Sequence, residues 1–401
     1  MTRLARPGGS PPTPRSVDVA RLAGVSQKTV SRVLNDEPYV SADVRRRVLD
    51  AAEELGYRRN QAARALASGR TRSIGVVTLG SALYGPASLL MGIERAVREV
   101  GYTLRVADTF EGDPGGIAGA LASLLDQGVD GVVISEPIDE GAGLISVDVP
   151  VLVLGAARTF AAPQVVTARV GAGLLARAAT EHLLELGHAT VHHLAGPQRW
   201  YSARDRLAGW REALRAHGAD EPPVVEGDWS AASGYAAGRE LAGDGTVTAV
   251  FAANDDMAIG LIRAQLEAGR RVPEDISVVG FDDIPVAAYV TPPLTTVRQP
   301  FDEVARQGLA LLVHVIEKPD VELPPAADQP VELVVRASTA PPPPRPIPGR
   351  GRRAIPHAHG GPHGQPAGSE VPSTQPLSAS ICPPTAARHP RPAPAVADER
   401  P

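Results

Sequence analysis

Three polar side chains, Gln27, Lys28 and Arg32, lie along a short segment that follows Gly24. A helix fits the major groove of DNA, and base edges are read by donors and acceptors near its N-terminus. Gln27 and Lys28 lie at that end, and Arg32, one turn on, can fork onto a guanine. The segment therefore predicts a helix that reads DNA. Hydroxyl groups that could bind phosphates and set the register are at Ser26, Thr29, Tyr39 and Ser41.

A second group of polar residues follows apolar runs that are typical of buried strands. Asn254 comes after the run 250–253, Asp282 comes after 278–281, and Arg206 lies in a helical pattern. In open α/β sheets the ligand binds at the carboxyl ends of the strands. Carboxylates accept hydroxyl hydrogens and Arg donates in a rigid fork, so this set suits a sugar. The alternative is structural, with Asn254 and Asp282 as strand-end caps and Arg206 paired with Asp205.

Short helices must position the DNA-reading residues. Ser16, Ser26 and Ser41 can each cap a helix, and these helices are predicted to run to about Leu22, Leu34 and Gly56. Residues 15–72 hold twelve Lys/Arg against seven Asp/Glu, although the whole chain has a formal net charge of -5. The positive charge that DNA binding needs is thus confined to one end of the chain. Three helices in this span predict a compact helix-turn-helix domain.

From residue 73 onward, β-branched runs alternate with amphipathic helical stretches, which predicts parallel βαβ units. A change from one lobe to a second is expected near Val170, so the natural packing is two doubly wound lobes. The expected segments are Ile74–Thr78, Leu89–Val100, Leu104–Ala107, Leu121–Gln127, Gly131–Ile134, Leu174–Leu186, Val191–Leu194, Ala203–His217, Val224–Glu226, Ala249–Ala252, Met257–Glu267, Ile276–Gly280 and Val331–Val335.

Composition excludes several classes of protein. With 401 residues and 43% hydrophobic content the chain can bury more than one core. The single cysteine, Cys382, permits no internal disulfide, residues 1–14 lack the apolar stretch of a secretory signal, and no run is long enough to span a bilayer. We therefore expect a cytoplasmic protein with no membrane partner. Beyond Thr339 the composition turns to Pro, Arg, His, Gly and Ser, which predicts a disordered tail.

An enzyme finds little support in the motifs. No dinucleotide fingerprint, phosphate loop or nucleophile elbow is present. His188, His192 and His193 cluster near a predicted strand, but alternation puts neighbours on opposite faces and no acid completes a metal set. No catalytic residue, cofactor or metal is expected. The histidines of the tail, such as His357, His359 and His363, are expected to be solvated rather than metal-binding.

Taken together, these motifs resemble the LacI/GalR family of bacterial repressors over about residues 16–339. The resemblance is carried by Asp18-Val19-Ala20, Ala23-Gly24-Val25-Ser26, Thr29-Val30-Ser31-Arg32-Val33-Leu34-Asn35, Leu55-Gly56-Tyr57, Asn60, Ala63 and Leu66. It implies that Gln27, Lys28 and Arg32 read bases, with Asn35, Tyr39 and Ser41 alongside.

Residues 60–67 resemble the family's hinge helix, in which a leucine at the position of Leu66 wedges between central base steps from the minor groove. Asn60 and Ala63 belong to the same segment. So short a helix is marginal in water, and it should order when two copies pack together on DNA. The alternative is a plain interdomain linker.

The resemblance also implies an effector pocket in which Arg206, Asn254 and Asp282 hydrogen-bond the ligand. Trp229 matches the position that stacks on a sugar, and Tyr84 and Trp200 add to the lining. Trp229 could instead belong to the core. The sequence departs from the family in the first lobe, with Gly155 where sugar-binding members can carry an acid, and Gly171-Ala172 near a position that commonly holds Asp.

The stretch Tyr84-Gly85-Pro86 resembles the first-lobe helix of members that respond to plant or milk oligosaccharides. A cellobiose-like or galactoside-like effector is expected, and a nucleobase acting as corepressor is the alternative.

The expected protein is a ligand-responsive DNA-binding regulator of carbohydrate-utilisation genes that binds a pseudo-palindromic operator as a homodimer. Ligand binding would change the lobe angle and destabilise the paired hinge helices. An exported sugar-binding protein is the rival, but it needs a signal sequence and has no use for residues 16–67. The expected divisions are 1–14, a disordered arm; 15–59, helix-turn-helix; 60–72, hinge helix and linker; 73–340, a two-lobed periplasmic-binding-protein-like core; and 341–401, a disordered Pro-rich tail.

Overall fold

The computed structural model describes the chain from residue 14 to residue 344 with several gaps. The described residues are 14–34, 37–57, 69–79, 82–110, 112–113, 115–135, 138–141, 143–155, 160–168, 171–323 and 332–344. The expectations for Asn35, for the hinge segment with Asn60, Ala63 and Leu66, and for residues 1–13 and 345–401 lie outside the described residues.

The N-terminal domain consists of three helices around a small apolar core. They are α1 (Ser16–Ala23), α2 (Gln27–Leu34) and α3 (Ala42–Glu54). Val19, Val30 and Val48, one from each helix, are fully buried against one another. Gly24 ends α1 in the left-handed conformation (φ 65°) that favours glycine, and this turn sets the angle at which α2 leaves. The predicted helix-turn-helix is confirmed.

The helix starts follow from local capping. The Ser41 hydroxyl accepts a hydrogen bond from the Val44 amide at 3.4 Å, and Ser26 accepts one from the Thr29 amide at 3.1 Å. The prediction that Ser16 caps α1 is wrong, because Ser16 is the first residue of the helix and Arg15 precedes it as the cap. The Arg15 amide instead donates to the carboxylate of Asp18 at 2.9 Å.

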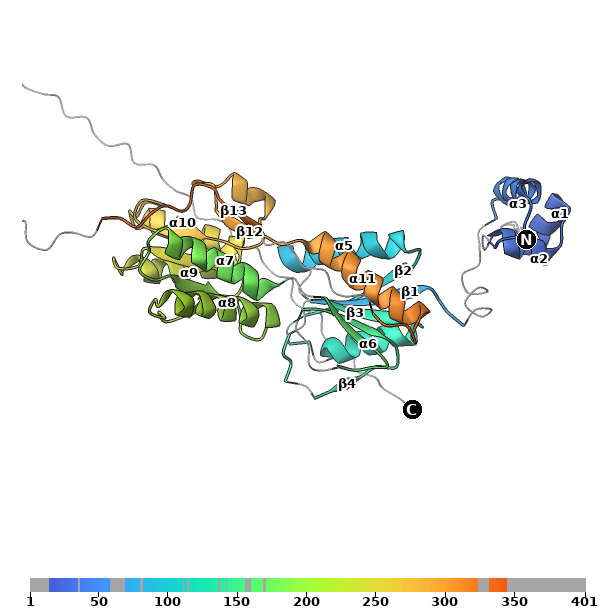
Figure 1. Cartoon of the computed structure of the whole chain (residues 1–401), viewed down its shortest axis with the longest axis horizontal. Coiled ribbons are helices and arrows are strands. Elements are labelled where there is room, and N and C mark those ends of the chain that lie inside the picture. The colour runs from blue at the N-terminus through green and yellow to red at the C-terminus, as the bar shows by residue number, and fades with distance from the viewer. Residues whose placement is uncertain are drawn as a thin grey trace, which may run out of the picture. The chain divides into compact units, whose positions relative to one another are not determined.

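The first lobe is a parallel sheet of five strands in the order β2-β1-β3-β5-β7. Alternate residues of β1 enter two different cores: Ile74 and Val76 pack with α5 and α11, whereas Val77 packs with α6. Figure 1 shows α5 and α11 side by side over the sheet. The elements are β1 (Ser73–Leu79), α5 (Tyr84–Glu99), β2 (Thr103–Thr109), α6 (Gly116–Asp126), β3 (Gly131–Ser135), β5 (Val151–Leu154) and β7 (Val165–Ala168), with a small pair β4 (Ile145–Ser146) and β6 (Phe160–Ala161).

The second lobe repeats this plan with four parallel strands in the order β11-β10-β8-β9. Phe251 of β10 packs with residues of α7 and α8, and its neighbours Val250 and Ala252 pack with α9 and α10. Both lobes are therefore covered by helices on both faces, as the doubly wound prediction requires. The elements are α7 (Ala172–Glu185), β8 (His192–Ala195), α8 (Tyr201–His217), β9 (Val225–Glu226), α9 (Ala231–Ala242), β10 (Ala249–Ala252), α10 (Asp255–Glu267), β11 (Ser277–Val279) and the short 3-10 helix η1 (Pro285–Ala288).

The chain does not stay in the second lobe after its lobe change near Val170. A helix missed by the sequence analysis, α11 (Phe301–Glu317), packs on α5, β5 and β7 of the first lobe. The chain then returns, and β13 (Glu332–Val334) pairs antiparallel with β12 (Thr296–Arg298) rather than extending a parallel sheet. The described elements therefore change lobe three times along the chain: between β7 and α7, between β12 and α11, and between α11 and β13. Each lobe thus contains an element that is distant in sequence from the rest of it.

The segment after β13 is built into the second lobe. Arg336 donates to a carboxylate oxygen of Asp283 at 2.6 Å, the Ser338 hydroxyl donates to the Val278 carbonyl at 2.6 Å, and the Ala340 amide donates to the Ser277 hydroxyl at 3.0 Å. His188 reaches the Ala340 carbonyl from the other side, at 3.0 Å. The core therefore ends in buried hydrogen bonds at about residue 340.

These contacts predict two different outcomes for two truncations. A chain that ends at Val335 loses the contacts of Arg336, Ser338 and Ala340. Its free energy of unfolding should fall by at least about 3 kcal/mol, because Asp283 loses the charge of Arg336 and several other groups lose their hydrogen bonds. A chain that ends at Pro344 keeps all of them and should match the full chain. Urea unfolding of all three proteins measures this, and equal stability of the two truncations would contradict it.

No helix among the described residues is long and apolar enough to cross a membrane.

Candidate functional site

The exposed face of α2 carries the residues expected to read DNA. Gln27, Lys28 and Arg32 are exposed, whereas Val30 and Val33 on the opposite face are buried. The burial of the valines fixes the orientation of α2. Gln27 and Lys28 therefore point to solvent at its N-terminal end, and Arg32 does so one turn later. Of the expected phosphate-binding hydroxyls, those of Ser26, Tyr39 and Ser41 are on exposed residues and Thr29 is half-buried.

In the absence of DNA these side chains contact neighbours. Gln27 Nε2 donates to the Ser16 hydroxyl at 2.7 Å, and Arg32 Nε lies 3.7 Å from a Glu37 carboxylate oxygen. Exposed contacts of this kind contribute at most about 1 kcal/mol, so a base edge can replace them. The placement of these residues suits a DNA-reading helix, and their individual roles stay predictions.

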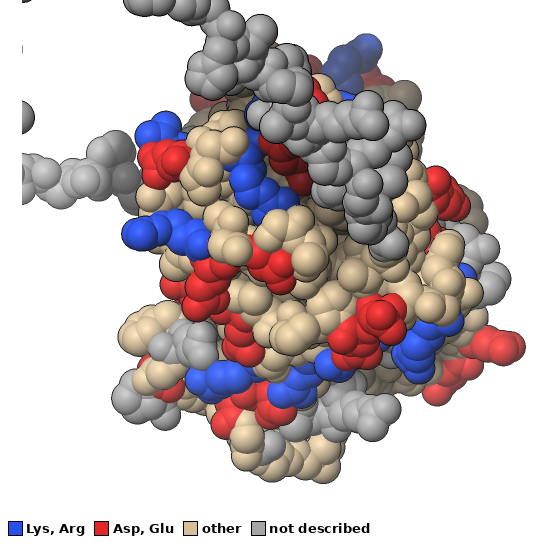
Figure 2. All heavy atoms as spheres, turned by 90° about the vertical axis from the view of Figure 1, so that its left-hand side faces the viewer, with Lys and Arg blue, Asp and Glu red and all other residues tan. Residues whose placement is uncertain are grey.

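One face of the molecule (Figure 2) shows a charge pattern that differs from the excess of Lys/Arg in residues 15–72. Figure 2 shows a face on which Lys/Arg and Asp/Glu side chains are interspersed rather than gathered by sign. Nonspecific binding of nucleic acid needs a continuous positive surface, which this face does not offer.

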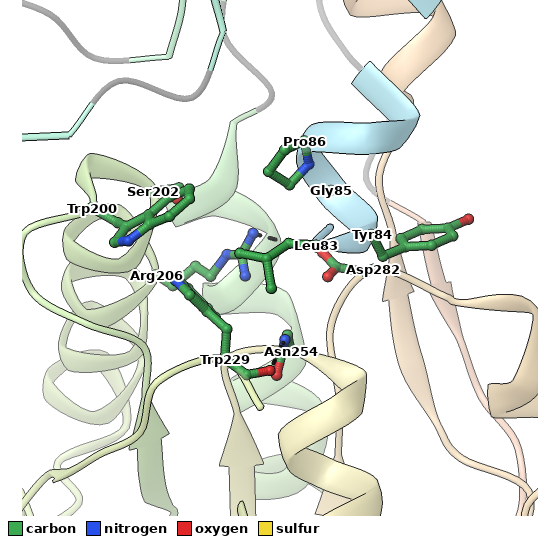
Figure 3. Close-up of a pocket in the computed structure, with 10 residues that line it drawn as sticks. All are labelled: Leu83, Tyr84, Gly85, Pro86, Trp200, Ser202, Arg206, Trp229, Asn254 and Asp282. Atoms are coloured by element: carbon green, nitrogen blue, oxygen red, sulfur yellow. Dashed lines mark hydrogen bonds and ion pairs between the residues drawn. The ribbon is translucent and has the colours of Figure 1, made fainter. Parts of the chain in front are cut away.

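A pocket of about 340 Å³, open to solvent, lies at the carboxyl ends of the strands. The strand order changes direction at β1/β3 in the first lobe and at β8/β10 in the second, and ligands bind at such switch points. The residues that line the pocket are Leu83, Tyr84, Gly85, Pro86, Trp200, Ser202, Arg206, Trp229, Asn254 and Asp282 (Figure 3).

Arg206 lies in the wall of this pocket and is 5% exposed. α8 carries it under the end of β10, where its Nη1 donates to the Ala253 carbonyl and its Nη2 lies 3.7 Å from Asp282 Oδ1. The guanidinium also lies over the rings of Phe281 (4.1 Å to the centroid) and Trp229 (5.2 Å). The alternative pairing with Asp205 on a solvated helix is therefore wrong for Arg206, because the side chain points into the protein.

Asn254 has a structural role whether or not it also binds a ligand. Its side-chain oxygen caps α10 by accepting from the Met257 amide at 3.0 Å, and its Nδ2 donates to the Trp229 carbonyl at 2.9 Å. The alternative named a strand-end cap, and the structure shows that what Asn254 caps is the start of helix α10; this leaves one amide hydrogen of Nδ2 for the pocket. The Trp229 backbone, held by this bond, adopts a positive φ of 72°.

The two tryptophans of the pocket form a corner. The ring centroids of Trp200 and Trp229 are 5.9 Å apart and their planes make an angle of 81°. The Trp229 ring lies so close to the backbone of Gly196 that a Cβ there would come within 2.2 Å of it, so only glycine fits. Both rings line the pocket, and their small exposed parts, 5% of Trp200 and 6% of Trp229, form an apolar wall against which the C–H side of a sugar ring could pack.

Asp282 is held in a strained turn after β11. Its φ is 114° and that of Asp283 is 53°, conformations that residues with a Cβ rarely adopt and that gather at functional sites. Gln299 Nε2 donates to Asp282 Oδ1. Below the turn, Asp255 accepts from the Ile284 amide at 2.8 Å and the Thr296 hydroxyl at 2.5 Å. Burial, together with the nearby Asp282 charge, raises the pKa of Asp255 well above its ordinary value.

The first lobe contributes apolar groups rather than charges to the pocket. Leu83, Gly85 and Pro86 come from the start of α5 and face the second-lobe residues. Tyr84 lines the pocket, but its ring points away from Arg206 and packs edge-on against Phe301 at 6.3 Å (Figure 3). Gly155, where an acid was expected in sugar-binding relatives, is not among the lining residues. Among the described residues of the lining, the charged ones, Arg206 and Asp282, therefore both belong to the second lobe.

Two buried donors at this pocket have no hydrogen-bond acceptor within the described part of the chain, namely Arg206 Nε and Trp229 Nε1. Buried donors are usually paired, and a water or a ligand oxygen is the kind of acceptor that could pair these two. The residues predicted from the sequence all line one pocket: Arg206, Asn254, Asp282, Trp229, Trp200 and Tyr84. Leu83 and Ser202 also line it and were not predicted, although Ser202 lies one turn before Arg206 on the same helix.

The histidines noted in the sequence are built into the second lobe. His188 is bonded to Thr248, Ser277 and Ala340, and His193 is fully enclosed between aromatic rings. Across the described ranges, no group of three or more His, Cys, Asp or Glu side chains could hold a metal ion.

Comparison with known proteins gives two family matches. Residues 17–60 match the model of bacterial regulatory proteins of the lacI family, and residues 180–339 match the periplasmic binding protein-like domain. The chain is 36% identical over 332 residues to the lactose operon repressor of Escherichia coli (strain K12), covering 81% of this chain and 90% of that protein.

Two solved structures extend the comparison. The lac repressor dimer bound to operator and the anti-inducer ONPF has a TM-score of 0.69 and 34% identity, covering 82% of this chain and 99% of that one. The complex of the transcriptional regulator CelR with cellobiose has a TM-score of 0.59 and 34% identity, covering 81% and 99%.

Proposed function

The chain belongs to the lacI family of bacterial regulatory proteins, and from this premise we propose that it represses carbohydrate-utilisation genes as a homodimer on a pseudo-palindromic operator, with a sugar as the effector. The observation that carries the proposal is the pocket in which Arg206, Asn254 and Asp282 meet two tryptophans, in a chain that also carries an exposed reading helix. No enzymatic activity is part of the proposal, and the protein is placed in the cytoplasm with its DNA.

The DNA side of the proposal rests on α2. A single recognition helix contacts few base pairs, and a two-fold dimer doubles the contacts on a palindromic site. The similar lac repressor was crystallised as a dimer on its operator. Gln27, Lys28 and Arg32 then read bases, and the hydroxyls of Ser26, Thr29, Tyr39 and Ser41 bind phosphates. Leu66, with Asn60 and Ala63, acts at the centre of the operator.

The effector side rests on the polarity of the pocket. A sugar edge can supply hydroxyl acceptors to Arg206 Nε and Trp229 Nε1 and hydroxyl donors to Asp282, while its C–H face lies on a tryptophan. Cellobiose is the first candidate, since the similar CelR was crystallised with it.

The proposal is tested by fluorescence-anisotropy titration of the full chain against a pool of palindromic duplexes with a central CG step, with and without mono- and disaccharides. A salt-sensitive, sequence-selective affinity that cellobiose or another sugar shifts by tenfold or more, about 1.4 kcal/mol, supports it. Selective DNA binding that no sugar changes contradicts the effector, and nucleobases are tested next. Absence of selective binding contradicts the regulator.

One substitution tests the reading helix. Gln27→Ala should cost about 1–3 kcal/mol of operator affinity at one base position while leaving effector binding unchanged, because Gln27 is exposed and its only loss within the domain is the bond to Ser16. Operators substituted at each position locate the lost contact. Arg21→Ala, an exposed change on α1, is the control. An unaltered base preference in Gln27→Ala would remove this residue from the reading face.

A further inference from the structure

The lobes touch at a point where the chain does not pass between them. After β3, residues Ile138 and Asp139 of the first lobe lie against the segment that precedes α8 in the second. Ile138 forms an antiparallel bridge with Trp200, and the Asp139 amide donates to the Arg199 carbonyl at 2.7 Å. Arg199 Nε in turn donates to the Asp139 carbonyl at 3.4 Å. This is a short piece of sheet between two lobes.

An ion pair closes the same contact. Arg204 Nη2 lies 3.0 Å from Asp139 Oδ2, while the other oxygen of Asp139 accepts from the Gly141 amide at 3.0 Å. Arg204 is itself fixed, since its Nε donates to the Gln198 carbonyl at 2.5 Å and its guanidinium lies over the Tyr201 ring at 5.2 Å. The Gly141 amide and Arg204 lower the pKa of Asp139. Asp139 and Arg204 therefore each have contacts within their own lobe that hold them in place.

The contact borders the pocket. Ile138 and Trp200 are each only 5% exposed and belong to one apolar cluster with Trp229. Trp200 lines the pocket and forms the tryptophan corner, and Ser202 and Arg206 follow it on α8 (Figure 3). The position of this wall relative to Leu83 and Pro86 of the first lobe therefore depends on whether residues 138–139 hold the start of α8.

We propose that residues 138–139 and 199–204 form a latch between the lobes, and that Asp139 and Arg204 are positioning residues for the effector. The latch holds the lobes in the arrangement that brings Trp200 to the pocket. A ligand that binds only this arrangement has its apparent affinity reduced by the fraction of molecules in which the latch is open. The statement about the effector rests on the proposed function, whereas the latch itself does not.

Hydrogen exchange of the full chain without ligand tests the latch. Arg204→Met removes the charge and keeps the length of the side chain. We expect the peptide that contains the Asp139 amide to exchange at least about fivefold faster, because this amide is protected only while the lobes are latched. Arg204→Lys, which keeps the charge, should restore most of the protection.

The matched control is Arg211→Met. Arg211 lies on the same helix and pairs with Glu221 at 2.8 Å within the second lobe, with an exposure similar to that of Arg204. It should leave exchange at Asp139 unchanged. Unchanged exchange in Arg204→Met, or an equal increase in Arg211→Met, would overturn the latch.

Calorimetric titration with cellobiose tests the link to the effector. Arg204→Met should bind cellobiose about three- to tenfold more weakly than the wild type. Equal cellobiose affinity would overturn the positioning role. If the wild-type chain does not bind cellobiose, the effector proposal fails, and the exchange data decide the latch by themselves.

Discussion

Replacing Arg206 with alanine is expected to weaken effector binding by at least about 100-fold and to lower the free energy of unfolding of the second lobe by about 3 kcal/mol. The first effect arises because Arg206 supplies charged donors to the pocket, including an Nε that has no acceptor among the described residues. The second arises because the Ala253 carbonyl and the Asp282 carboxylate, which is 7% exposed, lose the guanidinium between them.

Two measurements separate these effects. Operator titration with and without cellobiose reports the effector response, and urea unfolding reports stability. Arg211→Ala, on the exposed side of the same helix, is the control and should change neither by more than about 0.5 kcal/mol. A variant that keeps the wild-type response would remove Arg206 from the pocket. A variant that loses the response without losing stability would show that Asp282 finds another partner.

The stability effect of Arg206 could not be predicted from the sequence. The motif around Arg206 indicates a ligand-binding arginine, and on that ground alone its removal should affect only the effector. The structure shows that the same side chain joins the ends of β10 and β11, because it contacts Ala253 and Asp282 at once. Position in a motif identifies the residue, but burial and partners decide what its loss costs.

Local patterns predicted the elements well where each element buries one face or both faces continuously. β10, with its run Ala249–Ala252, was predicted with the bounds that the structure gives; α2 and α3 follow from the capping residues Ser26 and Ser41, and Gly24 ends α1. In these segments the sequence period and the burial agree, so no information from distant parts of the chain is needed.

The return of α11 to the first lobe is the main feature that the pattern could not give. The periodicity of residues 301–317 can show that one face is buried, but not which sheet covers it. The structure supplies the reason, since Phe301 packs on Tyr84, and Gly92 and Gly131 leave room for Ala305 and Ile316. These partners are about 200 residues away in sequence. The antiparallel pairing of β13 with β12 likewise depends on the return of the chain from α11 to the second lobe.

The polar residues of the pocket were predicted from their positions in the fold, and the aromatic ones from the family resemblance. Asn254 and Asp282 follow strands and Arg206 lies on the helix after β8, so all three lie near the carboxyl ends of the strands. Leu83, an apolar residue at a lobe boundary, carries no chemical signal. The strained backbone at Asp282 and the capping bond of Asn254 depend on atomic contacts that sequence spacing does not encode.

Acid is expected to destabilise the second lobe through His193, and His193→Phe is expected to remove most of that effect. The imidazole is fully buried in β8, stacked on Phe251 at 4.8 Å and on Trp210 at 5.4 Å. Its Nδ1 bonds to the Phe251 carbonyl at 2.9 Å, and its Nε2 has no partner among the described residues. Burial lowers the pKa of His193 from 6.5 to about 4, the Phe251 carbonyl opposes this, and the Arg206 charge adds to it.

The sign of the effect follows from proton binding. Between pH 6.5 and pH 4 the unfolded histidine binds a proton that the folded one does not, so acid favours unfolding. The contribution of neutral His193 to stability is complete above pH 6.5 and is lost as the pH falls toward 4, a loss of about 3 kcal/mol for a shift of this size.

Phenylalanine at position 193 keeps the stacking and cannot be protonated. Urea unfolding at pH 7 and pH 4 should therefore show a difference between wild type and His193→Phe that changes by about 3 kcal/mol. His217→Gln, an exposed change at the end of α8, should track the wild type. Parallel pH profiles for wild type and His193→Phe would mean that water or a rearranged ring accommodates the proton, and that the enclosure between Phe251 and Trp210 is looser than its geometry indicates.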